Sequence, residues 1–414
     1  MNTTDVVWMS LSTALVLLMT PALAFFYAGL VRSKNSLNTL MMSFVSLGVV
    51  GIAWALFGFS LAFGKGGALI GDTSAFFLRG VEFGVGTGTI PDLLFMAYQG
   101  TFAIITAALI SGAIVERMDF RAYMLFIALW ALAIYAPVAH WVWGGGWLAR
   151  LGALDFAGGT VVHVNAAGAA LVAAIVVGSR KDYGRRAFVP HNVPFTLLGA
   201  GMLWFGWFGF NAGSALSAGK SSVLAFVTTF LAPMATIVVW ALLDLWKSGK
   251  VTAVGTATAL VVGLVAITPA AGLVSPISAI ALGALAALPS YYALLYRARH
   301  RLDDSLDVVA AHGIGGTVGA VLTGVFAQNS WSGQANGLLF GNPKQVLIQI
   351  AAVLAVLAYT LVGTWAILKL IGLFMPLRAE AREENLGLDL SLHGELAYSE
   401  GEGAILVPLQ GVPS

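Results

Sequence analysis

Residues 345–374 read QVLIQIAAVLAVLAYTLVGTWAILKLIGLF, and Lys369 is the only charged side chain among them. A helix needs about 20 apolar residues to cross the hydrocarbon core of a bilayer. Similar runs recur along the chain, and they lack the polar alternation of membrane-barrel strands. The pattern predicts an all-α polytopic membrane protein with eleven transmembrane helices, near residues 5–31, 38–63, 91–114, 121–140, 156–179, 193–215, 222–246, 251–272, 277–297, 306–328 and 345–374.

The composition agrees with a membrane protein and excludes several classes of soluble protein. Of 414 residues, 59% are hydrophobic and 10% are charged, and the mean hydropathy is +0.88. An average soluble protein is about 25% charged, so a soluble enzyme, a nucleic-acid-binding protein and a disordered chain are excluded. The net charge of +2 indicates no strongly acidic or basic partner. The lack of cysteine excludes disulfides, thiolate metal sites and a cysteine nucleophile.

The distribution of Lys and Arg predicts the orientation, because cytoplasmic loops carry an excess of positive charge. With the N-terminus outside, five of the 21 basic residues face outward: Lys65, Arg79, Arg150, Lys220 and Lys344. The other sixteen lie in cytoplasmic segments: Arg32, Lys34, Arg117, Arg121, Arg180, Lys181, Arg185, Arg186, Lys247, Lys250, Arg297, Arg299, Arg301, Lys369, Arg378 and Arg382. We therefore predict N-out and C-in, with the first span kept as a helix and not a signal peptide, since no basic residue precedes it.

The spans suggest two related halves. Residues 1–375 form the predicted transmembrane domain, in which 5–179 and 193–328 are inverted five-helix repeats and 345–374 is an additional helix. Each half ends in a span with one histidine, His163 or His312, beside a run of small residues. Inverted repeats commonly place a transport site at their interface. Residues 376–414 are polar and charged and form the predicted cytoplasmic tail.

His163 and His312 are the sharpest candidates for function. Polar side chains within spans are rare and usually face the bundle interior. A neutral imidazole donates through one nitrogen and accepts through the other, so two of them can line a path for a small polar molecule. The alternative is two unrelated histidines, each satisfied by a neighbouring carbonyl. No third ligand at metal spacing accompanies them, so we predict no metal site and no cofactor.

Aromatic residues lie near the predicted outer ends of several spans. Phe210 and Ser214 share one helix face, as do Tyr98 and Phe102, and Trp143 follows the fourth span. Together they supply ring faces and a hydroxyl, which a cation–π site for a small cation requires; core packing is the alternative. Asp155 precedes His163 by eight residues, where a carboxylate caps a helix start. No P-loop, nucleophile elbow or HExxH pattern is present, so the sequence does not indicate an enzyme.

Several long motifs resemble the ammonium transporter family, the Amt/Mep/Rh superfamily, and its bacterial and archaeal Amt branch in particular. They are PALAFFYAGLVRSKN (21–35), DFAGGTVVHVNA (155–166), WFGFNAGS (207–214), DVVAAHGIGG (307–316) and GLDLSLHGE (387–395). The resemblance implies a homotrimer in the plasma membrane, which is the cell inner membrane where a cell has two, with one pore per subunit, used for nitrogen uptake. It also implies a PII-type signalling protein that docks on the cytoplasmic face.

The resemblance also assigns roles to residues. It places the outer recruitment site for ammonium on Trp143, Phe102 and Ser214, and a gate on Phe102 and Phe210. The histidine pair of the pore falls on His163 and His312, and a structural carboxylate falls on Asp155.

The hypothesis for function is transport of ammonium, and of methylammonium, by loss of a proton at the outer site and passage of ammonia along an apolar pore. Whether the proton returns outward or crosses separately along the histidines stays open. The main alternative is an ammonium sensor that acts through a cytoplasmic signalling partner. A Rh-like gas channel and a membrane-embedded enzyme are further alternatives.

Overall fold

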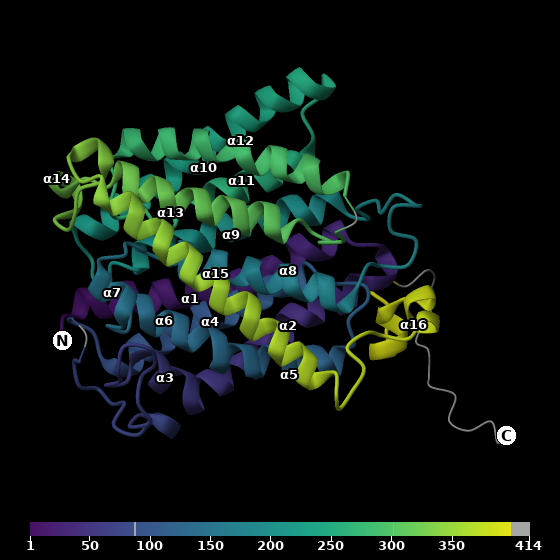
Figure 1. The fold of residues 1–414 in the computed structure, drawn as a ribbon, viewed down its shortest axis with the longest axis horizontal. Helices are drawn as coiled ribbons and strands as arrows, with labels where there is room; N and C mark the ends of the chain where they lie inside the picture. The colour runs from purple at the N-terminus through teal and green to yellow at the C-terminus, as the bar shows by residue number, and fades with distance from the viewer. Residues whose placement is uncertain (87, 301, 399–414) are drawn as a thin grey trace.

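The computed structural model describes residues 1–86, 88–300 and 302–398 of the chain, and these ranges contain helices and loops without a β-strand. Arg301 and the tail beyond residue 398 lie outside them. Figure 1 shows the α-helices, which are α1 (Thr3–Leu30), α2 (Ser36–Ala53), α3 (Phe59–Phe63), α4 (Asp92–Ser111), α5 (Phe120–Trp130), α6 (Ala136–Val142), α7 (Trp147–Leu151), α8 (Asn165–Val177), α9 (Val193–Gly213), α10 (Lys220–Ser248), α11 (Ala253–Ile267), α12 (Pro276–Ala298), α13 (Gly315–Phe326), α14 (Asn329–Ser332), α15 (Lys344–Ile371) and α16 (Ala381–Leu386).

Shorter helical turns of other kinds complete the architecture. Three are 3₁₀-helical: η1 (Ser33–Asn35), η3 (Phe76–Leu78) and η7 (Leu338–Phe340). Five are π-helical: η2 (Trp54–Gly58), η4 (Ala131–Tyr135), η5 (Gly159–Val164), η6 (Val309–Ile314) and η8 (Asp389–His393). Such π-turns are rare, and they occur frequently at functional sites.

The prediction of a multi-pass helical membrane protein is confirmed. Within the described ranges, ten helical segments are long and apolar enough to cross a bilayer. The segment predicted at 251–272 forms a shorter apolar helix, α11, which ends at Ile267. Pro269 explains this end, because it has no backbone N–H with which to continue the helical hydrogen bonds.

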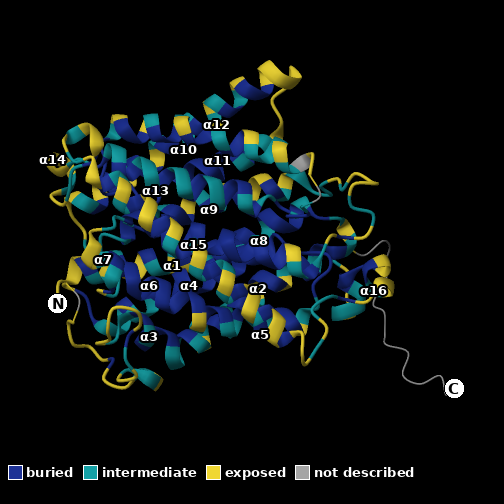
Figure 2. Cartoon of the chain, in the orientation of Figure 1, coloured by how far each residue is buried: buried dark blue, intermediate teal, exposed yellow. Residues whose placement is uncertain are grey.

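The long helices run side by side along the longest axis of the molecule (Figure 1). The N-terminus and α14 lie at one end, and α16 lies at the other. Figure 2 shows the buried residues in the centre of the bundle and exposed stripes on the peripheral helices. The exposed stripes are apolar: Val238 and Leu242 of α10 and Leu347 and Leu354 of α15 all face outward. Lipid rather than water is the solvent that suits such a surface.

The end that carries α16 is held by buried ion pairs and by the C-terminal segment. Arg180 bridges Asp303 at 2.7 Å and Glu116 at 2.8 Å. Burial alone would raise the pKa of the Glu116 carboxyl, but Arg180 and Arg32 outweigh that effect and hold the pKa below its ordinary value. Asp389 accepts the backbone N–H groups of Leu37 at 3.0 Å and Asn38 at 2.7 Å, so η8 caps the start of α2.

Candidate functional site

Two phenylalanine rings close the path between the helices. Phe102 of α4 and Phe210 of α9 stack with their ring centroids 4.2 Å apart. Phe210 is 0% exposed and Phe102 is 1% exposed. Rings at this separation are in van der Waals contact, so nothing passes between them unless a side chain moves.

Trp143 and Ser214 lie beside this ring pair. The Trp143 ring meets the Phe102 ring edge to face at 6.0 Å, and its indole N–H donates to the Asp155 carbonyl at 2.8 Å. The Ser214 hydroxyl donates to the Phe210 carbonyl at 2.9 Å. Its oxygen therefore keeps a lone pair for an incoming donor. Tyr98 packs against Phe102 and places its hydroxyl 3.3 Å from that of Ser214.

The two histidines lie on the other side of the phenylalanine pair and touch each other. The Nδ1 atoms of His163 and His312 are 3.1 Å apart, although the residues are 149 positions apart in the chain. One Nδ1 must donate and the other must accept, so the pair shares a single hydrogen at this contact. Nε2 of His163 is buried and has no hydrogen-bond partner within the described part of the chain. The pair can thus offer a polar atom to a small molecule without a fixed charge.

Local structure explains why the histidines meet. His163 lies in η5 and His312 in η6, the π-turns that start α8 and α13. Asp155 accepts four backbone N–H groups at the start of η5, from residues 158–161, at 2.6–3.0 Å. Asp304 accepts two at the start of η6, from Val308 at 3.1 Å and Val309 at 2.7 Å. A carboxylate at this position satisfies N–H groups that would otherwise lack partners.

The acidic cluster Asp303, Asp304 and Asp307 opens the span that carries His312, where the sequence predicts capping, and Asp304 is the member that caps η6. Asp304 precedes His312 by eight residues, as Asp155 precedes His163. This equal spacing is a signal in the sequence, and it pairs each histidine with its own helix-capping carboxylate. The sequence analysis gave Trp207 no role, but its ring stacks on His163, with the ring centroids 5.5 Å apart.

The cavities follow the same line through the molecule. A narrow cavity of about 10 Å³ reaches both histidines and Phe210, and its other lining residues are Met19, Leu23, Phe26, Ile105, Leu109, Val162, Leu203, Trp207 and Val261. A site for one water needs about 10–15 Å³, so this space suits one molecule of that size. Beyond His312 a cavity of about 160 Å³ extends to Asp307 and Arg297. Outside Trp143 an open cavity of about 680 Å³ contains Lys65, Arg79 and Asp92.

These features define a class of protein: a helical membrane channel or transporter with a narrow, largely apolar path for a small polar molecule. In the part of the chain that the structure describes, no three His, Cys, Asp or Glu side chains are grouped to hold a metal ion.

Comparison with known proteins identifies the family. The family model described as Ammonium Transporter Family matches residues 7–398, and the chain belongs to this family. It is 48% identical over 400 residues to an ammonium transporter of Bacillus subtilis, covering 96% of this chain and 98% of that protein. The solved structure of Saccharomyces cerevisiae Mep2 is similar with a TM-score of 0.89 at 35% identity, covering 98% of this chain and 93% of that one. A structure titled Sensor Amt Protein is similar with a TM-score of 0.87 at 29% identity, covering 94% and 98%.

Proposed function

We propose that this protein transports ammonium by taking up the cation at Trp143, Phe102 and Ser214, removing one proton, and passing ammonia between Phe102 and Phe210 to the two histidines. The observation that carries this proposal is a continuous line of rings. The centroid of the Phe210 ring lies 4.2 Å from that of Phe102 and 6.0 Å from that of His163. The ring centroids of His163 and His312 are 5.2 Å apart. The narrow cavity along this line is large enough for one small molecule.

Deprotonation accounts for selectivity. Ammonium and potassium ions are nearly equal in size, so a size filter does not separate them. Moving either ion into a medium of low dielectric constant costs tens of kcal/mol by Born estimates. Ammonium avoids this cost by leaving its proton behind, whereas potassium has no neutral form. An apolar cavity behind a closed ring pair therefore favours ammonia over potassium.

The histidine pair supplies hydrogen bonds where the remaining lining is apolar. Ammonia both donates and accepts hydrogen bonds, and the unpartnered Nε2 of His163 is a complementary group. A hydrogen bond there offsets part of the cost of removing ammonia from water. Because the Nδ1 atoms are 3.1 Å apart, two charged imidazoles would repel, and a neutral pair does not trap the substrate as an ion.

The test is a flux assay in liposomes, with methylammonium or ammonium as solute and potassium as the control ion. We expect His163→Ala and His312→Ala each to abolish selective flux while both variants remain folded. The lipid-facing variant Val238→Ala should retain it. Unchanged flux in both histidine variants would contradict the proposed path.

The same assay separates the two routes for the proton. If the proton crosses separately along the histidines, ammonium addition produces an inward current together with the flux. Ammonia flux without current would instead mean that the proton returns to the outer side.

We also propose an orientation, an assembly and a partner. The excess of basic residues on the end that carries α16 supports N-out and C-in. The equal placement of Asp155–His163 and Asp304–His312 supports inverted halves at 5–179 and 193–328, with 345–374 added and 376–414 as the cytoplasmic tail. A homotrimer and a PII-type protein at the cytoplasmic face follow from the family resemblance. Native mass measurement and pull-down with a PII protein test them.

A second candidate function is ammonium sensing through a cytoplasmic partner. The similarity to the structure titled Sensor Amt Protein is the observation that favours ammonium sensing as a candidate. Partner binding that responds to ammonium in a protein without measurable flux would support it, whereas selective flux in purified liposomes would support transport.

A further inference from the structure

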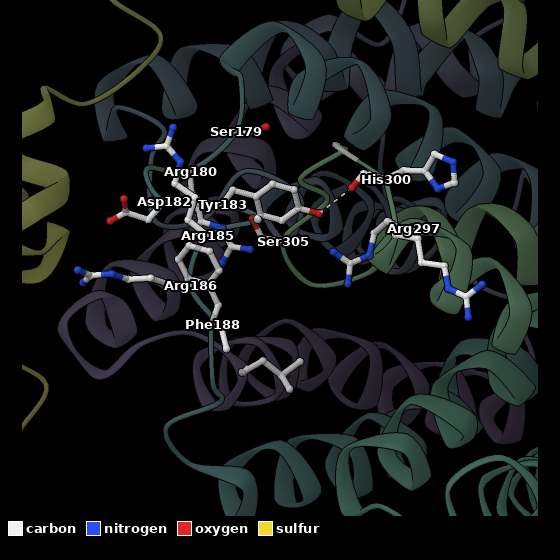
Figure 3. Close-up of a pocket in the computed structure, with 14 residues that line it drawn as sticks. Ser179, Arg180, Asp182, Tyr183, Arg185, Arg186, Phe188, Arg297, His300 and Ser305 are labelled. Atoms are coloured by element: carbon white, nitrogen blue, oxygen red, sulfur yellow. Dashed lines mark hydrogen bonds between the residues drawn. The ribbon is translucent and has the colours of Figure 1, made fainter.

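A large open pocket lies at the end of the molecule that carries α16, on the far side of the histidines from Trp143. Its volume is about 950 Å³, and it is lined by residues of two segments, 179–188 and 297–305 with Arg301 excepted, and by Leu30 of α1 (Figure 3). The two segments face each other across the pocket, and the Tyr183 side chain extends from the first toward the second. The transport path does not use this pocket as a binding site.

The pocket is strongly basic. Five arginines line it against one aspartate, Asp182. Arg180 is neutralised by Asp303 and Glu116, and Arg297 by Asp307. Arg185, Arg186 and Arg299 are exposed, and no carboxylate of the described residues lies within ion-pair distance of them. Unpaired guanidinium groups around one pocket attract an anion.

The walls of the pocket are held in place by hydrogen bonds. The Tyr183 hydroxyl donates to the Leu302 carbonyl at 2.9 Å and ties the two segments together. Arg117 donates to the Ser305 hydroxyl at 2.6 Å, and Arg180 joins the base of the first segment to Asp303 of the second. A site formed in advance loses less entropy when a ligand binds.

The chemistry of the lining favours phosphate. The planar guanidinium fork matches phosphate oxygens and forms paired, charge-assisted hydrogen bonds. The aromatic ring of Phe188 is already engaged, because the guanidinium carbons of Arg32 and Arg180 lie 4.7 Å and 4.1 Å from its centroid. The pocket is thus suited to recognise phosphate groups and not to stack a nucleobase on this ring.

We propose that this pocket binds a phosphate-bearing anion, either a free polyphosphate or the headgroup of an anionic lipid. Leu30, Phe188, Arg297 and Ser305 line both this pocket and the cavity that reaches His312. A bound anion therefore lies over the inner end of the transport path and obstructs it. This second consequence rests on the proposed transport function, whereas the binding itself does not.

The first test measures binding of inorganic pyrophosphate to the full-length protein in detergent, by calorimetry at constant ionic strength. We expect saturable binding that Arg185→Gln/Arg186→Gln weakens at least about tenfold, since two charge-assisted contacts are lost. Arg185→Lys/Arg186→Lys should restore part of it. The control Arg121→Gln/Lys250→Gln removes the same charge from exposed residues outside the pocket and should bind as the unmodified protein does.

The second test identifies the source of the phosphate and the effect on flux. The experiment uses phosphatidylcholine vesicles. If pyrophosphate reduces the flux of the unmodified protein but not that of the Arg185/Arg186 variant, the ligand is a free polyphosphate. Flux that responds only to added phosphatidylglycerol, with the same dependence on the two arginines, indicates a lipid headgroup. Pyrophosphate binding with unchanged flux would overturn the obstruction while supporting the site.

Three outcomes would overturn the binding proposal itself. They are no binding of either phosphate source, equal binding by the unmodified protein and the Arg185/Arg186 variant, or equal weakening by the control variant. Binding of an acidic protein at these arginines, without phosphate binding, would also overturn it. If the unmodified protein shows no selective flux, this result would count against the transport proposal only, because pyrophosphate binding is measured separately.

Discussion

At the scale of single residues, Trp143 lines the open cavity outside the phenylalanine pair, where the proposed site would use its ring face. Its N–H is already bonded to the Asp155 carbonyl. We predict that Trp143→Leu raises the ammonium concentration for half-maximal flux about fivefold, because a cation–π contact contributes about 1 kcal/mol. Trp143→Phe should restore part of the affinity. The measurement is the concentration dependence of flux; Trp331→Leu, an exposed tryptophan elsewhere, is the matched control.

We predict that Asp155 has a structural role and stabilises the folded protein. It is the acceptor for four buried backbone N–H groups, so Asp155→Ala leaves all four without that partner. We expect a loss of about 3 kcal/mol or more in the free energy of unfolding, together with reduced flux. Asp119→Ala, which removes a cap with two N–H partners at α5, should cost about 1 kcal/mol. Equal thermal unfolding midpoints for the two variants would contradict the structural role.

The residues of the candidate site could largely be predicted from the sequence, but the contacts between them could not. The positions of His163 and His312 in corresponding spans led to a prediction of a shared site, and the structure brings their rings together. Residue type and spacing did not reveal that each lies in a π-turn, because that geometry depends on packing around Asp155 and Asp304. The role of each site residue in transport stays a prediction.

At the scale of elements, glycines allow α1 and α9 to pack closely. A side-chain carbon at Gly199 would lie 2.3 Å from the Phe26 nitrogen, and one at Gly209 would lie 2.8 Å from the Ser12 carbonyl oxygen. Small residues at helix contacts let backbones approach in this way. The histidine and phenylalanine geometry depends on this packing, because α9 carries Phe210.

This contact gives a prediction with an internal control. Gly199→Ala forces the two backbones apart, and we expect it to destabilise the protein by about 1–3 kcal/mol. Gly201→Ala lies on the same helix with nothing within 4 Å of the added carbon, so it should be neutral or slightly stabilising. Thermal unfolding in detergent measures both. Equal midpoints would show that α1 and α9 tolerate separation.

Long apolar elements were predictable because membrane spans depend mainly on length and composition. The end of α11 at Ile267 shows where this approach is weaker: the apolar run continues to Gly272, but the backbone turns around Pro269. The π-turns within the second and fourth spans, η2 and η4, likewise have no compositional signal.

At the scale of the whole molecule, the C-terminal segment is joined to the end of the bundle that carries α16. Nε2 of His393 lies 3.0 Å from Nδ2 of Asn38. Because the amide nitrogen of Asn38 can only donate, Nε2 of His393 accepts, and its imidazole is therefore neutral. Burial lowers the pKa of His393, and Glu395 offsets part of this effect. The neutral His393 ring therefore contributes its full stabilisation to the docked segment above the ordinary histidine pKa of about 6.5. That stabilisation is lost as the pH falls from there through the lowered pKa.

We therefore predict that residues 387–393 detach as the pH is lowered from 7.5 toward 5. Amide exchange at Leu388, whose N–H donates to Asn35, should become faster after correction for intrinsic rates. Burial raises the pKa of the nearby Asp389 carboxyl, which acts in the opposite direction. His393→Gln keeps a polar side chain that does not titrate, and it should remove the acceleration. Equal pH dependence in that variant would assign the effect to another group.

The stacked rings of Phe102 and Phe210 have a consequence for the cell's energy supply. While they stay stacked, they interrupt any file of water molecules along the proposed path, and a broken file does not relay protons. A membrane crowded with many copies of this protein would therefore keep its pH gradient and its potential.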